Sequence, residues 1–329
     1  MGKTVKQIDV IDSMIIKELL IDARRNFVEI AKKCKISTDT VAEHIFELEK
    51  SGIIVGSTIQ VNRKAMGRKA VCSILVKAEP NKVDEVAEYL RKISYDVPFL
   101  IKSPKSNIAL IVGLNNIDEI GNLKETIRRN KYILDLKIEN WLDVKSTPEN
   151  LEITPQSKCG DGKEKNVTAQ ASHRRAGYKL DDTDLQLIEK LMCNSRQSFG
   201  EIAKEIESSI STVSRKYKKL TQPGIIRPVI QVNLSKLGYQ AVDVFSLSYA
   251  PQSDSEAIIR ELAEIKDNIL MIKASGEYDL FVHVVLRDLN QLLETQNQIA
   301  NVEGVARMES VIYPVTVPWP AVGEYISTF

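Results

Sequence analysis

The chain repeats itself, and this duplication constrains its fold more than any other feature. Residues 8–54 align without a gap to residues 180–226, and 17 of these 47 positions are identical. The identities include Arg24 and Arg196, and the run Glu-Ile-Ala-Lys recurs at residues 29 and 201. A repeat at a fixed period is the signature of duplicated structural units. The 329 residues are therefore predicted to form two versions of one architecture.

The first third of each copy has the pattern of three helices. In copy one, apolar residues recur at helical spacing from Ile8 to Leu20, a short helix is predicted over residues 27–34, and a third begins at Ser37, a good N-cap. Two short helices joined by a brief turn are typical of a helix-turn-helix, whose final helix lies in the DNA major groove. A three-helix bundle without a ligand is the alternative.

The third helix of copy two carries the strongest DNA-binding signal. It is predicted over residues 209–221, with Val213, Tyr217 and Leu220 facing inward. Its other side carries hydroxyls and cations and no carboxylate, and such groups contact phosphates and base edges. The residues assigned to DNA here are Ser211, Thr212, Ser214, Arg215, Lys216, Lys218 and Lys219. We expect this helix to be the main DNA reader.

The corresponding helix of copy one has the opposite charge. Its outward stripe includes Asp39 and Glu43, with Glu47 and Glu49 nearby, and these carboxylates would be repelled by DNA phosphates. The residues that could still contact DNA are Ser37, Thr38, Thr40 and His44, followed farther along by the basic residues Arg63, Lys64, Arg68 and Lys69. We expect the first helix-turn-helix to be weakened or repurposed.

The remainder of each copy alternates strands and helices. In copy one the predicted order is strand, helix, strand, strand, helix, strand, over residues 70–78, 82–93, 98–103, 107–113, 117–130 and 132–142. Copy two repeats this order between residues 242 and 313. The pattern is that of a ferredoxin-like βαββαβ unit. Such a sheet leaves one face open unless a second unit covers it, so pairing of two units is expected.

Charge suggests which units pair. Residues 63–145 carry 16 Lys and Arg against 11 Asp and Glu, whereas residues 234–329 carry 6 against 13, giving balances of +5 and −7. Opposite charges favour contact and penalise like-with-like pairing. We hypothesise that the two βαββαβ units pair, within one chain or in a swapped pair of chains. The alternative is that these charges are solvated and indifferent.

The sequence thus predicts an α+β chain of five segments. They are a winged-helix-like helix-turn-helix domain (1–62), a βαββαβ domain (63–145), a polar linker (146–179), a second helix-turn-helix domain (180–233) and a second βαββαβ domain with a C-terminal tail (234–329). No apolar run approaches the length of a membrane span, and the four cysteines include no Cys-x-x-Cys pair. We expect a cytoplasmic protein without a catalytic residue set, metal site or cofactor.

These motifs together resemble the Lrp/AsnC family of transcription regulators, the leucine-responsive regulatory protein type. The resemblance rests on Asp-x-x-Asp at the start of the first helix, Asp-Ala-Arg at residues 22–24, Glu-Ile-Ala-Lys, Ser-x-x-Thr-Val and Gly-Ile-Ile, all followed by the βαββαβ unit. It covers each copy nearly end to end. It implies a regulator that binds double-stranded DNA, self-associates through its βαββαβ units and often senses an amino acid or related small molecule there.

The resemblance also points to an effector site. In the family this site is associated with a Gly-x-Tyr-Asp turn between the second and third strands, which copy two retains as Gly276, Tyr278 and Asp279. Gly276 could adopt positive φ and let a ligand approach its backbone, and Asp279 could accept hydrogen bonds from an ammonium group. The alternative is a simple hairpin turn with a solvated Asp. Copy one has Ser-Pro-Lys-Ser-Asn at residues 103–107 instead.

Two other functions stay open. Siroheme decarboxylases of the haem-precursor pathway resemble the same family and work as pairs of unequal units. Their polycarboxylate tetrapyrrole calls for a cationic pocket with His or Arg, but the second βαββαβ unit is acidic, and His283 falls within a strand pattern as a satisfied core histidine would. The other function is a protein-interaction module with vestigial DNA binding, in which the proline-rich tail at residues 314–320 docks a partner or seals the sheet edge.

Overall fold

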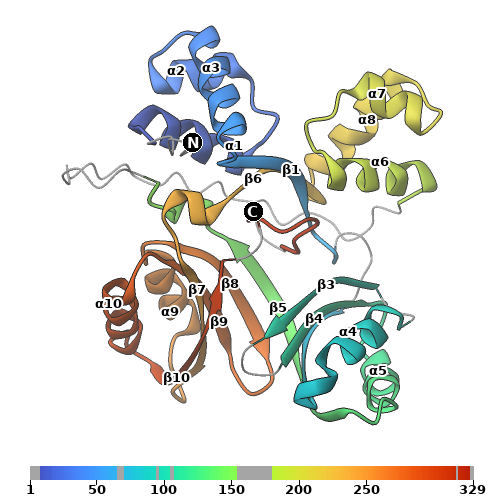
Figure 1. Ribbon diagram of the computed structural model, residues 1–329, viewed down its shortest axis with the longest axis vertical. Helices are drawn as coiled ribbons and strands as arrows, with labels where there is room; N and C mark the ends of the chain where they lie inside the picture. The colour runs from blue at the N-terminus through green and yellow to red at the C-terminus, as the bar shows by residue number, and fades with distance from the viewer. Residues whose placement is uncertain are drawn as a thin grey trace.

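Two helix-turn-helix units lie at one end of the molecule and two sheet-and-helix units at the other (Figure 1). The computed structural model describes residues 8–64, 70–93, 96–103, 107–153, 180–315 and 318–326. Both copies therefore adopt the predicted α+β architecture. No helix in these ranges is long and apolar enough to cross a lipid bilayer.

Each helix-turn-helix unit contains three helices. They are α1 (Val10–Ile21), α2 (Phe27–Cys34) and α3 (Thr38–Lys50) in copy one, and α6 (Asp182–Cys193), α7 (Phe199–Glu205) and α8 (Ile210–Thr221) in copy two. A capping box begins the first helix of each unit, because the Asp9 carboxylate accepts from the Asp12 amide at 2.7 Å and Asp181 accepts from Asp184 at 2.9 Å. The Asp-x-x-Asp motif is thus a helix start.

An antiparallel ribbon joins the two helix-turn-helix units. Strand β1 (Ile54–Val61) pairs with β6 (Ile226–Val232), with Ile54 opposite Val232 and Val61 opposite Ile226. Ile59 and Val229 are fully buried on it. The sequence alone does not predict this ribbon, because each strand pairs with a partner more than 160 residues away.

The sheet units form one continuous sheet of eight strands. Its order is β10-β7-β9-β8-β5-β2-β4-β3, made of β2 (Ala70–Ala78), β3 (Asp96–Ser103), β4 (Asn107–Leu114), β5 (Ile133–Ser146), β7 (Ala241–Tyr249), β8 (Asn268–Ser275), β9 (Leu280–Leu286) and β10 (Val305–Pro314). The helices are α4 (Val83–Arg91) and α5 (Glu119–Arg128) in copy one, and α9 (Ser255–Ala263) and α10 (Leu289–Ala300) in copy two. Short 3-10 turns span Pro80–Lys82, Pro148–Asn150 and Leu234–Leu237.

Strand β5 is the joint between the two sheet units. Its first half pairs with β2, from Ile133 to Asn140, and its second half pairs with β8, from Asn140 to Ser146. The hypothesis that the basic unit pairs with the acidic unit is therefore confirmed within the chain. An ion pair between Lys137 of unit one and Glu277 of unit two, 2.6 Å long, follows the predicted charge difference.

The equivalent second joint is not formed. By the internal repeat, β10 and β3 correspond to β5 and β8, but in the described residues β10 pairs with β7 alone and β3 with β4 alone. Proline has no N–H to donate to a ladder, and Pro98 lies in β3 while Pro314 ends β10 and Pro318 follows. Each proline thus removes one donor from these strands, and in the described residues the sheet is open between β3 and β10.

The predicted linker begins too early. Leu151 and Ile153 are buried in the core cluster that also contains Ile15 and Tyr239, and the Thr147 amide donates to the Ile269 carbonyl at 3.0 Å. Residues 146–153 are thus an ordered continuation of β5, held because their apolar side chains reach the first helix-turn-helix core. The rest of that segment, residues 154–179, lies outside the described residues.

Candidate DNA interface and adjoining cavity

The exposed side of α8 is cationic. Ser209 is its N-cap and accepts from the Thr212 amide at 3.1 Å, which places Ser211 on the surface at the start of the helix. Arg215, Lys218 and Lys219 are exposed, and none of them forms an ion pair with another described residue. Thr212 and Ser214 are half-buried at the edge of this stripe. The surface defined by Ser211, Arg215, Lys218 and Lys219 is called the α8 stripe below.

Lys216 does not belong to the α8 stripe. Only 9% of the residue is exposed, and its ammonium lies 2.6 Å from Asp181 Oδ2 and 2.9 Å from Asp184 Oδ1. Burial of the ammonium opposes its charge, but the hydrogen bonds to the two carboxylates outweigh this and raise the pKa of Lys216. The expectation that Lys216 contacts DNA is therefore wrong for this conformation, because the side chain braces the start of α6.

His44 occupies the matching place in copy one. Its Nδ1 lies 2.7 Å from Asp12 Oδ1, and ligand atoms of Asp9, Asp12 and His44 all lie within 4.8 Å of one another. Three such atoms could hold a metal ion. The Lys216 ammonium fills the corresponding space between Asp181 and Asp184, so we interpret both clusters as braces between the first and third helices. His44 therefore points toward Asp12, into its own unit.

The exposed side of α3 is acidic, as predicted. Ser37 caps the helix by accepting from the Thr40 amide at 3.0 Å, and Thr38 is exposed beside it. Asp39, Glu43 and Glu47 follow on the surface, and Phe46 is 61% exposed. Of the basic residues that follow, Arg63 is buried and Lys64 donates to the Leu142 carbonyl, while Arg68 and Lys69 lie outside the described residues. Of the two described residues of this basic extension, Lys64 is thus on the surface and Arg63 is not.

Two arginines hold the helix-turn-helix units together reciprocally. Arg24 reaches into copy two, where its Nε donates to the Ser195 carbonyl at 2.6 Å and its guanidinium lies 4.4 Å from the Phe199 ring centroid. Arg196, the duplicate of Arg24, lies 5.9 Å from the Phe27 ring centroid and 3.3 Å from Glu49. A contact in which each copy offers the same residue to the other is the arrangement of a twofold dimer. Copy one and copy two thus form a built-in pseudo-dimer.

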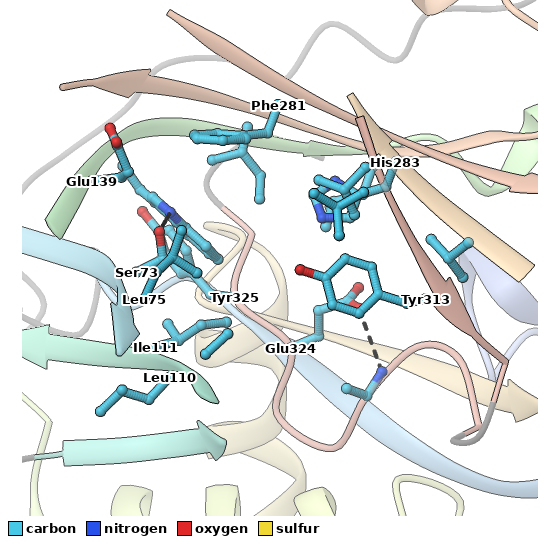
Figure 2. Close-up of a pocket in the computed structure, with 18 of the residues that line it drawn as sticks. Ser73, Leu75, Leu110, Ile111, Glu139, Phe281, His283, Tyr313, Glu324 and Tyr325 are labelled. Carbon is cyan, nitrogen blue, oxygen red and sulfur yellow. Dashed lines mark hydrogen bonds between the residues drawn. The ribbon is translucent and has the colours of Figure 1, made fainter. Parts of the chain in front are cut away.

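A cavity of about 470 Å³ lies between the open faces of the two sheet units. Its walls come from β2, β4 and β5 on one side, from β7, β8, β9 and β10 on the other, and from the C-terminal segment, residues 318–326 (Figure 2). Aromatic side chains dominate the lining: Trp141, Tyr278, Phe281, Tyr313, Trp319 and Tyr325. The sequence alone does not predict this cavity, because it forms only where the two sheet units face each other.

Two titratable groups of the cavity lining, those of His283 and Glu324, have strongly shifted pKa values. His283 extends from β9 into it, and its Nδ1 has no hydrogen-bond partner among the described residues. Burial lowers the pKa of His283 to about 4, so the ring is neutral at pH 7. Burial raises the pKa of Glu324 to about 7, although a hydrogen bond from Gln60 Nε2 at 2.6 Å opposes the shift. The His283 ring also forms a hydrogen bond with the Leu270 backbone, so position 283 is a core histidine, as expected, with one ring nitrogen lacking a partner among the described residues.

The groups of the predicted effector turn, residues 276–279, contact other residues of the chain itself. Gly276 does not adopt positive φ, and a Cβ built on it would lie 1.9 Å from Glu139 Oε2. Glu139, from β5 of copy one, accepts from the Glu277 amide at 3.2 Å. Asp279 accepts from the Tyr249 amide at 2.8 Å, whereas Tyr278 is buried and lines the cavity. Gly276 is thus required for close approach of a carboxylate, and that carboxylate belongs to the chain itself.

Comparison with known proteins shows which domain families the two copies match. Residues 8–55 match winged helix-turn-helix DNA-binding domains, residues 180–221 the AsnC-type helix-turn-helix domain and residues 244–316 the Lrp/AsnC ligand binding domain. The HTH-type transcriptional regulator Ptr1 of Methanocaldococcus jannaschii is 33% identical over 114 residues, which are 34% of this chain and 76% of Ptr1. The chain belongs to the Lrp/AsnC family. The predicted resemblance is confirmed.

Other relatives fit the same duplication. LrpA of Pyrococcus horikoshii, an HTH-type transcriptional regulator, is 34% identical over 116 residues, which are 35% of this Lrp/AsnC chain and 82% of LrpA. Each regulator thus corresponds to one copy. The crystal structure of the siroheme decarboxylase NirDL matches 97% of the chain and 94% of its own length, with a TM-score of 0.62 and 14% identity. At that identity the likeness concerns the fold alone.

Proposed function

We propose that this Lrp/AsnC protein is a sequence-specific DNA-binding transcription regulator that acts in the cytoplasm, with α8 as its main DNA reader. The observation that carries the proposal is the α8 stripe, in which Arg215, Lys218 and Lys219 are exposed and have no carboxylate partner in the part of the chain that the structure describes. Cations free of internal ion pairs can neutralise phosphates, and Ser211, Thr212 and Ser214 offer hydroxyls to base edges and phosphates.

The pairing of the two units supports an asymmetric mode of binding. The β1–β6 ribbon and the Arg24 and Arg196 contacts join the two helix-turn-helix units, as a dimeric helix-turn-helix protein joins its two DNA-reading helices. The carboxylates Asp39, Glu43 and Glu47 disfavour DNA at α3. We therefore propose that α8 reads one half-site, while Ser37, Thr38 and Thr40 add weaker contacts from the first unit.

The test is a fluorescence anisotropy titration against fragments of the gene's own upstream region. The variant Arg215→Glu/Lys218→Glu is expected to lose at least a hundredfold in affinity, because two phosphate contacts become repulsive. The control Arg128→Glu/Arg260→Glu makes the same charge change on exposed positions of α5 and α9, far from the helix-turn-helix units, and should bind as the wild type does. A larger loss on reversing Glu43 and Glu47 would assign the reading role to α3.

A small-molecule effector is part of the proposal, since residues 244–316 match a ligand binding domain. The groups of the Gly276 turn are engaged with Glu139 and with the Tyr249 amide, so the internal cavity is the better supported site. Thermal-shift screening of the twenty amino acids tests whether the effector is an amino acid. A shift with none of them would exclude that class.

A second candidate function rests on the whole-chain likeness to NirDL. The cavity lies between unequal units, but its lining includes the cations Arg63, Lys77 and Lys137 and the carboxylates Asp135, Glu139, Glu277 and Glu324. A pocket with more carboxylates than cations does not suit a polycarboxylate tetrapyrrole. A tetrapyrrole absorbance band on the purified protein, or a shift of the absorbance band of an added iron tetrapyrrole, would favour the enzyme. An added iron tetrapyrrole whose band the protein leaves unchanged would favour the regulator.

Association between chains is also proposed. Strands β3 and β10 each have one free edge in the described residues, and an exposed edge can pair with another chain. Light scattering on the purified protein measures the number of chains. A mass above 37.0 kDa would support association, and a single-chain mass at every concentration would exclude it.

A further inference from the structure

The C-terminal segment, residues 318–326, contacts the cavity on one side and the ribbon on the other (Figure 1, Figure 2). Trp319 exchanges two backbone hydrogen bonds with Val232 of β6, 2.8 and 3.0 Å long. The Val61 amide of β1 donates to the Glu324 carbonyl at 2.8 Å, and Ile326 donates back to Val61 at 3.2 Å. One short segment is therefore bonded to both strands that join the helix-turn-helix units.

A buried polar chain connects the same parts through side chains. Glu324 lines the cavity and accepts from Gln60 Nε2 at 2.6 Å, and the other end of that amide accepts from Arg227 Nε at 2.9 Å. Gln60 lies on β1 and is fully buried, and Arg227 lies on β6. Leaving one hydrogen-bonding group of such a buried network without a partner costs free energy. A change at Glu324 therefore alters the hydrogen bonds of both strands.

The lining specifies the chemistry of an occupant. Six aromatic side chains and many aliphatic ones form the walls. Three of the charged lining groups are engaged within the protein: Lys137 forms an ion pair with Glu277, and Glu324 accepts from Gln60. The unpaired Nδ1 of His283 leaves one hydrogen-bonding group unsatisfied among these apolar walls. Flat apolar molecules stack on aromatic rings, and a polar group aimed into an apolar pocket fixes their orientation.

We propose that this cavity binds a flat, uncharged aromatic molecule beside His283, and that the segment 318–326 couples its occupancy to the two helix-turn-helix units. The coupling half of the proposal rests on the proposed DNA-binding function, whereas the binding half does not. A ligand shifts a conformational equilibrium only through contacts that differ between states, and here those contacts are Trp319, Glu324 and Tyr325.

The first test measures binding with the neutral fluorophore N-phenyl-1-naphthylamine. We expect a saturable, blue-shifted signal with one site per chain. Val311→Trp fills the cavity from β10 and should raise the Kd at least tenfold, and Leu75→Trp should do the same from the opposite wall. Ile312→Trp is the matched control, because Ile312 is the next residue of β10, is 45% exposed and does not line the cavity.

Thermal unfolding of each variant checks that it folds, and the second cavity variant serves if the first does not. A signal that never saturates, or titrations that are the same for Val311→Trp and Ile312→Trp, would overturn the binding site. Stronger binding of a polycarboxylate iron tetrapyrrole than of the neutral fluorophore would overturn the ligand class.

The second test measures coupling on the full chain. Saturating N-phenyl-1-naphthylamine should change DNA affinity at least threefold, and by reciprocity the DNA should change the fluorophore's affinity by the same factor. Gln60→Leu should keep fluorophore binding and bring that factor to one. Unchanged DNA affinity in the saturated wild type would overturn the coupling, whereas absence of DNA binding in the free protein would count against the proposed function and leave the cavity result standing.

Discussion

The guanidinium of Arg24 lies over the ring of Phe199, 4.4 Å from its centroid, although 175 positions separate the two residues along the chain. The duplicate residue Arg196 lies near Phe27 in the other direction. This exchange explains why the arginine and the phenylalanine three residues after it recur in the two copies. The arginine of one copy docks on the second helix of the other, so the motif serves the pairing of the two units.

Replacing Arg24 should weaken the contact between the two helix-turn-helix units. Arg24→Ala removes a stacked guanidinium and the donor to the Ser195 carbonyl, and we expect a loss of about 2 kcal/mol in the free energy of unfolding. Urea unfolding monitored by circular dichroism measures it. The adjacent Arg25→Ala breaks only an ion pair within copy one, with Glu18, and should cost less. Equal losses for the two variants would contradict a role for Arg24 in pairing the units.

The two neighbouring lysines of α8 should behave differently. Lys216→Ala leaves the fully buried Asp184 without its cation, and removal of one partner from a buried pair costs about 3 kcal/mol. Lys218→Ala removes an exposed cation, so stability should change by less than about 0.5 kcal/mol. Thermal unfolding of both variants, followed by DNA titration, separates the roles. Stability unaffected by Lys216→Ala would show that the brace contributes nothing.

Stability should fall as pH rises from about 5 to 7. Burial raises the pKa of Glu324 to about 7, so the folded chain holds a proton that the unfolded chain releases near its ordinary pKa of 4.5. The contribution is present below pH 4.5 and is lost as pH rises through 7. Glu324→Gln should flatten this part of the pH profile of the free energy of unfolding. The expected difference is about 1 kcal/mol, a modest value because the cavity side of Glu324 can contact water. Parallel profiles for wild type and variant would contradict the assignment.

Gly276 should tolerate a side chain only when Glu139 is removed. Gly276→Ala places a Cβ 1.9 Å from Glu139 Oε2 and forces that carboxylate off the Glu277 amide, at an expected cost of about 1 to 2 kcal/mol. In the Glu139→Ala background the same change should cost almost nothing. A double-mutant cycle by chemical unfolding measures the difference. Additive losses would exclude the contact as the reason for glycine.

The local elements were predictable from the sequence because helix and strand periods are local signals. Helix α2 and strand β2 have their predicted bounds, and Ser37 and Ser209 cap the two third helices. Opposite charge on the two sheet units also predicted that they pair. The internal repeat contributed most to these predictions, because a helix or strand expected in one copy is supported by the same pattern in the other copy.

The features that the sequence did not predict depend on contacts between segments that lie far apart along the chain. The β1–β6 ribbon and the cavity form only where the two copies contact each other, and no local sequence pattern predicts them. Lys216 was assigned to DNA because helical spacing alone cannot tell that Asp181 and Asp184 lie within reach. Its alignment with His44, a residue that also pairs with an aspartate, was the available signal. Gly276 likewise faces a carboxylate that comes from copy one.

The salt dependence of DNA binding tests the central claim most directly. The logarithm of the association constant should fall linearly with the logarithm of salt concentration, and Arg215→Ala should make the slope shallower by about 0.9, the value for one lost phosphate contact. The distant control Arg260→Ala should leave the slope unchanged. A wild-type chain whose affinity for duplex DNA does not vary with salt, or a slope that Arg215→Ala does not alter, would contradict the assignment of α8 as the DNA reader.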